Sequence, residues 1–193
     1  MKLILASSSP RRIELLSRIT SNFIAIPSEV DETSSGPPEA RVLALARAKA
    51  EWVARRHHGL VIGADTIVVL DDEPLGKPAS RAAAREMLAR LSGRSHRVLT
   101  GLHVVSTFTG QWQESCEETE VVFRELADEE IEWYLDTGEY TDKAGGYGIQ
   151  GKGAIFVEKI RGDYFNVMGL PLCRLYLMLR SLGYRLPRGP AAG

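Results

Sequence analysis

An almost unbroken apolar run, LVIGADTIVVL, extends from Leu60 to Leu70. A strand with apolar side chains on both faces has to be covered on both faces, as strands in the middle of α/β sheets are. The run therefore predicts a central strand with helices on either side of its sheet. Helix-like and strand-like segments alternate before this run, and strand-like segments follow one another after it, which favours a mixed sheet.

Asp65 lies in the middle of this apolar run. A carboxylate in such a strand has to be hydrogen-bonded, ion-paired, or placed where the strand meets a cleft. One interpretation makes Asp65 a metal ligand or a general base, and the other makes it a structural residue that caps an adjacent loop. Because Asp is rarely buried without a partner, the functional interpretation is favoured.

A second informative segment is LILASSSPRR at the beginning of the chain, in which strand-like residues are followed by Ser9, Pro10 and two arginines. Pro suits the first helical position and Ser suits the N-cap, so a helix is predicted to begin at Pro10. The free N–H groups of a helix N-terminus, together with Arg11 and Arg12, would suit a phosphate. A capped surface helix with solvated arginines explains this segment equally well on its own.

The remaining elements follow from apolar periodicity and from turn residues. Strands are predicted over 22–27, 96–108, 114–124 and 154–160. Helices are predicted over 37–58 with Gly59 as C-cap, over 80–91 with Ser80 as N-cap, over 128–136 and over 170–182. The chain from 1 to 186 is expected to form one domain, followed by a flexible tail over 187–193.

The composition excludes several functional classes. The 193 residues are 44% hydrophobic and carry 24 basic and 25 acidic side chains, so the formal net charge of −1 does not favour a nucleic-acid partner. Cys116 and Cys173 lack the spacing of a metal site and are expected to be buried thiols. No apolar run approaches the ~18 residues that a membrane span needs, so no membrane partner and a cytoplasmic location are expected.

An acidic loop over 28–38 carries Glu29, Asp31 and Glu32. Taken alone, such a loop is best interpreted as solvated surface. It would also suit a hard cation such as Mg²⁺, which uses one or two carboxylates and completes its shell with water and phosphate oxygens. The second interpretation requires the fold to bring the loop close to Asp65.

A glycine-rich segment over 143–153 contains G-x-x-x-x-G-K from Gly146 to Lys152. Gly153 follows where a P-loop needs Ser or Thr, and a strand-like segment follows instead of a helix, so a P-loop is rejected. Gln150 offers both a donor and an acceptor to a ligand, although the segment is also explained as a tight connection. The chain has neither H-E-x-x-H nor G-x-S-x-G, which argues against zinc hydrolases and serine esterases.

Taken together, several motifs of the chain resemble those of the Maf family of nucleoside triphosphate pyrophosphatases. They are LILASSSPRRIELL, EVDET, LARAKA, IGADTIVVL, GKP, LSGRSHRVLTG, DKAGGYGIQGKG and VMGLPL, and they cover nearly the whole chain in order. The resemblance implies an elongated, two-lobed α/β fold like that of inosine triphosphate pyrophosphatases. A central mixed sheet flanked by helices and a cleft between the lobes are expected within residues 1–186.

The resemblance also implies hydrolysis of a nucleoside triphosphate to the monophosphate and pyrophosphate, with Mg²⁺ or Mn²⁺ as cofactor. Asp65 is then the proton acceptor, with Lys49 and Lys77 as further catalytic residues, and Glu32 joins Asp65 in holding the metal. Substrate binding is expected at Ser7, Ser9, Arg12 and Lys143.

Three positions, Arg11, Thr66 and Gln150, match the set seen in family members that resemble dTTP/UTP pyrophosphatases. An amide such as that of Gln150 can pair with both the N–H and the carbonyl of uracil or thymine. The resemblance therefore implies a housecleaning enzyme that acts on dTTP, UTP and modified pyrimidine triphosphates, and it also implies a homodimer. The alternatives are the same chemistry on 7-methyl-GTP or another modified nucleotide, or a nucleotide-binding regulator of cell division.

Overall fold

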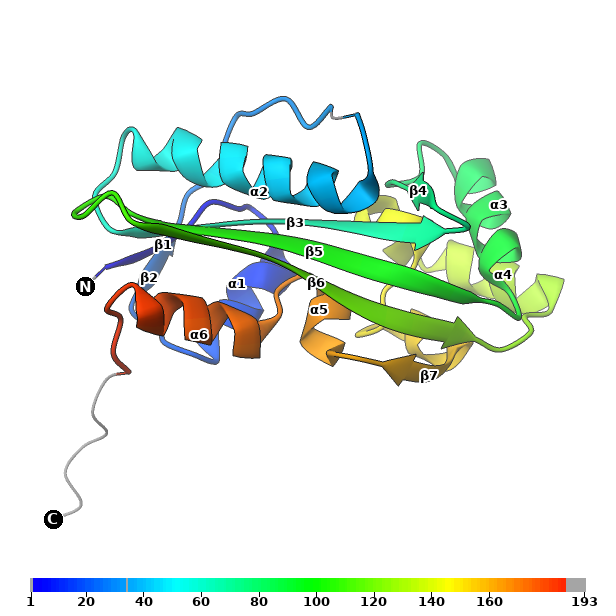
Figure 1. Cartoon of the computed structure of the whole chain (residues 1–193). Helices are drawn as coiled ribbons and strands as arrows, with labels where there is room; N and C mark the ends of the chain where they lie inside the picture. The colour runs from blue at the N-terminus through cyan, green and yellow to red at the C-terminus, as the bar shows by residue number, and fades with distance from the viewer. Residues whose placement is uncertain (1, 34, 187–193) are drawn as a thin grey trace, which may run out of the picture.

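A central seven-stranded sheet runs through the structure, a computed structural model that describes residues 2–33 and 35–186 (Figure 1). The strand order is β2-β1-β3-β5-β6-β7, with β4 paired to β3 outside this path. β1 pairs in parallel with β2 and β3, whereas the β3–β5, β5–β6 and β6–β7 pairs are antiparallel. The strands are β1 Leu3–Leu5, β2 Phe23–Ala25, β3 Leu60–Leu70, β4 Glu73–Leu75, β5 Ser95–Ser106, β6 Trp112–Phe123 and β7 Val157–Arg161.

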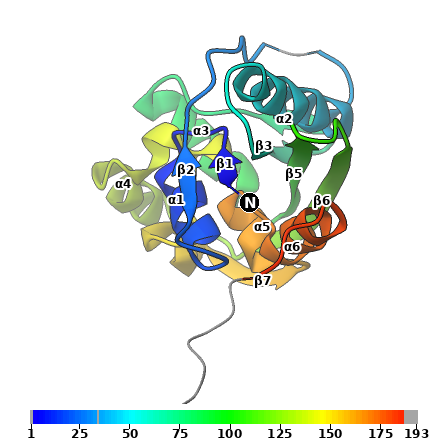
Figure 2. The same cartoon turned by 90° about the vertical axis from the view of Figure 1, so that its left-hand side faces the viewer.

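Helices flank the sheet, so the expected mixed α/β class is confirmed. Helix α2 lies along one face, α1, α5 and α6 lie on the other, and α3 and α4 lie beyond the end of β3 (Figures 1 and 2). Their bounds are α1 Pro10–Ser17, α2 Pro38–Ala54, α3 Arg81–Leu91, α4 Asp128–Asp136, α5 Tyr164–Met168 and α6 Leu172–Ser181. Within the described residues, no helix has the length and apolar character that crossing a membrane requires.

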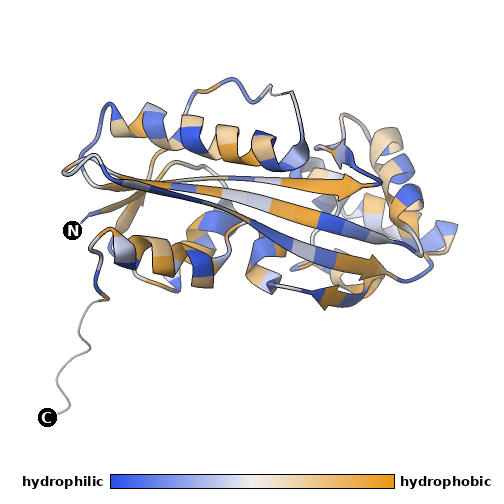
Figure 3. Ribbon diagram, viewed as in Figure 1, coloured by the Kyte–Doolittle hydropathy of each residue, from blue (hydrophilic) through white to orange (hydrophobic). Residues whose placement is uncertain are grey.

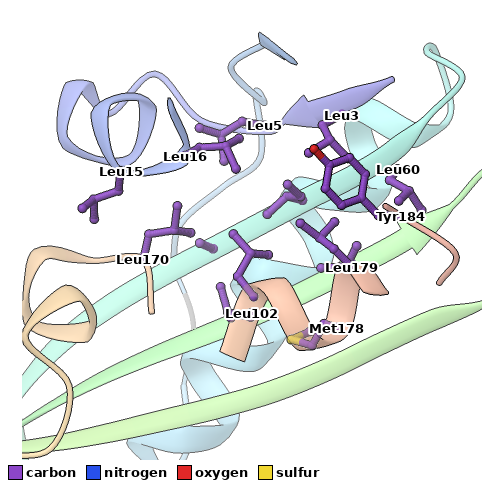
Figure 4. Packing of buried hydrophobic residues seen from close by; sticks show 14 of the residues in the cluster. Leu3, Leu5, Leu15, Leu16, Leu60, Leu102, Leu170, Met178, Leu179 and Tyr184 are labelled. Carbon is purple, nitrogen blue, oxygen red and sulfur yellow. The ribbon is translucent and has the colours of Figure 1, made fainter. Parts of the chain in front are cut away.

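Two apolar clusters lie at opposite ends of the long strands. The first packs α1, β1 and α6 against β3 and β5, and Figure 4 shows Leu16, Leu102 and Leu179 within it. The second packs α3 and α4 against the far ends of β3, β5 and β6. Figure 3 shows the strongly apolar colouring of the end of β3, which belongs to the second cluster. The strand predicted from the apolar run thus contributes to both clusters.

Two glycines allow α2 to lie unusually close to the sheet. A Cβ at Gly63 on β3 would clash with the carbonyl oxygen of Ala46, and a Cβ at Gly101 on β5 would clash with the backbone of Val42. Side chains normally keep a helix farther from a sheet than this, so neither position accepts even a methyl group without movement. The close approach sets the distance between α2 side chains and those of β3.

The predicted end of α2 was wrong. The helix ends at Ala54 with Arg55 as its C-cap, so residues 55–58 lie outside it and Gly59 is not the cap. Gly59 instead lies against β1, where a Cβ would be 2.7 Å from the carbonyl oxygen of Lys2. The glycine therefore meets a packing requirement of the sheet.

Four further segments differ from the sequence predictions. The strand expected from Ala154 begins only at Val157, because a 3₁₀ helix, Lys152–Phe156, precedes it. Helix α5 and the short strand β4 were not predicted, and the last helix begins at Leu172, after Pro171.

Of the two cysteines expected to be buried, Cys116 is half-buried and Cys173 is exposed.

Several boundaries agree with the predictions. Ser80 caps α3 by accepting a hydrogen bond from the Ala83 N–H, and α4 spans the predicted residues. Ser9 is the N-cap residue of α1, although its side chain makes no capping bond. The extent of a single domain over 1–186 stays a prediction, and the predicted flexible tail over 187–193 lies outside the described residues.

His96 on β5 is buried inside the second cluster. Its Nε2 lies 2.7 Å from the hydroxyl of Tyr147, and its Nδ1 has no hydrogen-bond partner among the described residues. Phe123 and Tyr147 pack edge-on against the imidazole ring. Burial lowers the pKa of His96 to about 4, because the surroundings do not solvate the charged imidazolium.

We expect the replacement Gly101→Ala to reduce the free energy of unfolding by about 1–3 kcal/mol, because α2 has to move away from β5. Denaturant titration followed by circular dichroism measures this change. Gly76→Ala is the matched control, since a Cβ at Gly76 would meet nothing within 4 Å. Equal stability of the two variants would contradict the proposed contact between helix and sheet.

We expect the burial of neutral His96 to make stability depend on pH. Its folded pKa lies below the unfolded value, so its contribution is present above about pH 6.5 and is lost as the pH falls toward 4. The wild type should lose about 2–3 kcal/mol more than His96→Gln between pH 7 and 4.5. Unfolding titrations at both pH values test this, with a replacement at the exposed His58 as control. Parallel losses in wild type and His96→Gln would contradict it.

Candidate active site

A cleft of about 890 Å³ opens between the first strand–helix connection, the part of α2 from Arg41 to Lys49, the middle of β3 and the glycine-rich segment. Every site residue predicted from the sequence lines this cleft. These residues are Ser7, Ser9, Arg11, Arg12, Glu32, Lys49, Asp65, Thr66, Lys77, Lys143 and Gln150. The fold thus brings together side chains that are up to 143 positions apart in the chain.

The cleft carries more positive than negative charge. Six cationic side chains line it, namely Arg11, Arg12, Arg41, Lys49, Lys77 and Lys143. The four carboxylates that line it are those of Glu32, Asp65, Glu139 and Asp142. A polyanion such as a triphosphate suits this excess of positive charge, although the whole chain is close to neutral.

Lys49 lies at the centre of the cleft between two carboxylates. Its Nζ is 2.7 Å from Oδ1 of Asp65 and 2.7 Å from Oε1 of Glu32. The Lys49 side chain is only 8% exposed, so both ion pairs are shielded from bulk water on the lysine side. The hydrogen bond from Lys49 lowers the pKa of Glu32. Oδ2 of Asp65 makes no hydrogen bond with any described residue.

The geometry of Glu32 and Asp65 is compatible with a divalent cation. Both carboxylates already contact a single cationic group, which shows that they lie close enough to share a charge. Over residues 2–33 and 35–186, no group of three or more His, Cys, Asp or Glu side chains is arranged to hold a metal. Two carboxylates suit Mg²⁺ or Mn²⁺, which takes its other ligands from water and phosphate, better than a fully protein-bound metal.

The remaining residues of the acidic loop lie elsewhere. Glu29 and Asp31 are exposed and do not line the cleft. Asp31 accepts a hydrogen bond from the Thr33 N–H at 2.8 Å and so shapes the loop locally. Only Glu32 of the three acidic residues reaches Asp65 through Lys49.

Arg12 is anchored from two sides. Its Nε donates to the carbonyl oxygen of Gly169 at 2.9 Å, and its Nη2 donates to Oγ1 of Thr66 at 3.0 Å. Gly169 has a φ of +107° and ends α5, a conformation that favours glycine. Burial lowers the pKa of Arg12, and the nearby Asp65 opposes this effect. Nη1 makes no hydrogen bond with the described residues, so it remains available to a ligand.

A directed chain of hydrogen bonds continues behind Arg12. Thr100 Oγ1 donates to the carbonyl oxygen of Asn166 at 3.2 Å, so its single proton is used there. Thr66 Oγ1, which is 2.9 Å from Thr100 Oγ1, must therefore be the donor of that pair. Because guanidinium only donates, Thr66 accepts from Arg12 and gives its own proton to Thr100. The hydroxyl of Thr66 is thus held in one orientation.

Two further contacts join α1 to the glycine-rich segment and its neighbours. Arg11 Nη1 is 2.9 Å from Oδ2 of Asp142, and Lys143 Nζ is 2.7 Å from Oδ1 of the same carboxylate. One helical turn after Arg11, Oε2 of Glu14 accepts a hydrogen bond from Nε2 of Gln150 at 2.9 Å. The predicted specificity residues Arg11 and Gln150 are thus both paired across the cleft, whereas Thr66 lies on its floor.

Lys77 and the serines complete the predicted set. Lys77 forms no hydrogen bond or ion pair with any residue that the structure describes, and its charge contributes to lowering the pKa of Glu32. The carbonyl oxygen of the preceding Gly76 accepts from the Gly145 N–H at 3.0 Å, which fixes this loop beside the glycine-rich segment. Ser7 Oγ accepts from the Ser9 N–H at 3.1 Å and shapes the turn before α1.

Sequence reasoning missed several residues that belong to this site. Arg41 lines the cleft and precedes Lys49 by eight positions on α2, so helical periodicity from Lys49 would have indicated it. Glu14, Thr100 and Asn166 hold cleft residues in place from outside the predicted set. Their roles depend on contacts between distant segments, and spacing within the sequence carries no signal for these contacts.

Comparisons with known proteins identify the family. A family model described as "Maf-like protein" matches residues 2–182. A "dTTP/UTP pyrophosphatase" of Symbiobacterium thermophilum is 51% identical over 98% of this chain and 98% of its own length. Proteins of the same name are 50% identical in Thermococcus gammatolerans, over 95% of this chain and 98% of theirs, and 52% identical in Moorella thermoacetica, over 94% and 95%.

Among solved structures, the Ham1 protein of Staphylococcus aureus is similar to this chain with a TM-score of 0.48 and 19% identity. The similarity covers 66% of this chain and 73% of that protein.

Proposed function

The chain belongs to the Maf-like protein family, and we propose that it is a nucleoside triphosphate pyrophosphatase that acts on dTTP and UTP. The observation that carries this proposal is the cleft, in which an excess of cationic side chains surrounds the central Asp65–Lys49–Glu32 group. Relatives named dTTP/UTP pyrophosphatase match this chain over nearly its full length, which supports the choice of substrate. Hydrolysis would remove these nucleotides, or modified pyrimidine analogues, from the cellular pool.

In the proposed reaction, a water oxygen attacks the α-phosphorus of the nucleotide. The bond from that phosphorus to the oxygen bridging to the β-phosphate breaks, and pyrophosphate leaves with the bonding electron pair. The water proton passes to Asp65, whose Oδ2 has no competing partner within the described residues. Lys49 holds Oδ1 and thereby fixes the orientation of the carboxylate.

The cations of the cleft would stabilise the charge that develops on the leaving pyrophosphate. Lys77 has no ion pair to break among the described residues, and Arg12 offers its unpaired Nη1. Lys143 has to share its ammonium with Asp142 and with the carbonyl oxygen of Glu139. Ser7 and Ser9 lie at the beginning of α1, where backbone N–H groups favour an anion.

Glu32 and Asp65 would hold a divalent cation, Mg²⁺ or Mn²⁺, together with the phosphates of the substrate. The bound cation would supply charge neutralisation and polarise the phosphoryl group. Lys49, which contacts both carboxylates, would share their oxygens with the cation and would keep Oδ1 of Asp65 in place. A homodimer and a cytoplasmic location remain predictions.

The replacement Asp65→Asn tests the proposed chemistry, because an amide cannot take up the water proton. We expect a 10²- to 10⁴-fold loss of kcat for pyrophosphate release, with nucleotide affinity retained. The panel contains dTTP, UTP, dCTP, CTP, 7-methyl-GTP and the common purine triphosphates. Asp71→Asn, at the turn after β3 and outside the cleft, is the matched control and should keep full activity.

Each result of this panel has a distinct meaning. Preference for dTTP and UTP, lost in Asp65→Asn, supports both the reaction and the substrate. Release from 7-methyl-GTP alone would keep the reaction and overturn the choice of base. The absence of release from every nucleotide would overturn the enzyme proposal and favour a nucleotide-binding regulator.

Removal of divalent cations tests the role of the carboxylates. A chelator should abolish activity, and added Mg²⁺ or Mn²⁺ should restore it. We expect Glu32→Gln to raise the metal concentration needed for half-maximal activity by about tenfold, because one anionic ligand is lost. Asp31→Asn, one residue away but outside the cleft, should leave this concentration unchanged. An equal response of both variants would argue against Glu32 as a metal ligand.

A further inference from the structure

Glu14 contacts a predicted specificity residue from outside the set that the sequence indicated. It lies on α1 one turn after Arg11, and its Oε2 accepts a hydrogen bond from Nε2 of Gln150 at 2.9 Å. Its other oxygen, Oε1, is 3.0 Å from Nη2 of Arg18 on the same helix. Both carboxylate oxygens are therefore engaged, one by the amide and one by the guanidinium.

The chemistry of this pair fixes which end of the Gln150 amide faces Glu14. An ionised carboxylate has no proton to donate, so only the nitrogen of the amide can pair with it. Hydrogen bonds from Gln150 and Arg18 lower the pKa of Glu14, so the carboxylate is ionised at neutral pH. If the amide rotated by half a turn, its carbonyl oxygen would face the carboxylate, and two acceptors would be opposed.

Gln150 lines the cleft, and its fixed amide presents a single hydrogen-bonding pattern to a ligand there. Oε1 accepts, and the second N–H of Nε2 donates. Uracil and thymine present a ring N–H beside a carbonyl, which matches this acceptor and donor. Cytosine presents a ring nitrogen acceptor beside an amino group, which would need the opposite amide orientation.

We propose that Glu14 is a positioning residue that holds Gln150 in the orientation that accepts uracil and thymine and rejects cytosine. This inference rests on the proposed function, because it concerns how the same cleft selects its base. A protein can reject a wrong base strongly when that base places donors against donors, or acceptors against acceptors, in the binding site. Glu14 extends the specificity set from three residues to four.

A second contact keeps Gln150 close to α1. Arg11 and Asp142 form an ion pair at 2.9 Å, so the segment that contains Gln150 is joined to α1 at two points one helical turn apart. Arg11 is half-buried and Gln150 is exposed. The Arg11 contact thus places the segment, and the Glu14 contact sets the direction of the amide.

The replacement Glu14→Gln tests the proposal. A glutamine at position 14 can either accept from or donate to Gln150, so both amide orientations become accessible. We expect the ratio of kcat/KM for dCTP to that for dTTP to rise about five- to tenfold, with the same change for CTP against UTP. A general structural defect would lower both rates together and would not change their ratio.

Two further variants test whether the contact between Glu14 and Gln150 causes the change in the base ratio. Arg18→Gln removes the ion pair of Glu14 on α1 but leaves the contact with Gln150, so the base ratio should stay at the wild-type value. In a Gln150→Ala background, Glu14→Gln should no longer change the ratio, because the amide that it orients is gone. Thermal unfolding of each variant checks that the fold is retained.

An unchanged ratio in Glu14→Gln would overturn the positioning role, and so would an equal change in Arg18→Gln. A wild type that hydrolyses cytosine and uracil nucleotides equally well would also overturn it, while the pyrophosphatase reaction would stand. Failure of the wild type to release pyrophosphate from any nucleotide would overturn the proposed function itself, and this result is distinct from all the others.

Discussion

The ion pair between Lys49 and Asp65 depends on how closely α2 approaches the sheet. Lys49 lies on α2 and Asp65 on β3, so the position of the helix on the sheet determines where Nζ of Lys49 meets Oδ1 of Asp65, 2.7 Å away. Gly63 and Gly101 permit this approach, because a side chain at either position would clash with the backbone of α2. A methyl group in the sheet would therefore disturb the centre of the cleft, although neither glycine contributes a functional group to it.

The charges of the cleft are mostly paired with one another. Lys49 is paired with two carboxylates, and Asp142 is paired with both Arg11 and Lys143. Partly buried ion pairs hold side chains in place without making the fold much more stable, because desolvation offsets much of the attraction. An incoming triphosphate can replace these carboxylates as the partner of the cations. Arg11, Lys49 and Lys143 are thus positioned and charge-compensated before a polyanion binds.

Local patterns predicted the elements whose signals lie within a few residues. The apolar run gave β3 its bounds, Ser80 marked the beginning of α3, and the segment over 128–136 formed α4 as predicted. The errors came where a distant contact decided the outcome. Gly59 was predicted to be a helix cap, but it is a glycine because the chain there packs closely against the backbone beside β1. The segment after Gly151 was predicted to enter a strand directly, but it forms a 3₁₀ helix before β7. Periodicity contains no information about such contacts.

The site shows the same division between local and distant information. Asp65 was recognisable because a carboxylate is out of place in an apolar strand, and motif resemblance added residues that the fold then gathered in one cleft. The residues that support them could not be predicted from the sequence. Thr100, for example, is an ordinary strand residue in the sequence, and only the fold shows that its hydroxyl accepts from Thr66 and donates to Asn166. With its proton committed to Thr100, Thr66 can offer a ligand only a lone pair. A base or sugar group that meets Thr66 must therefore bring the donor itself, and this constraint is set by a residue that never contacts the ligand.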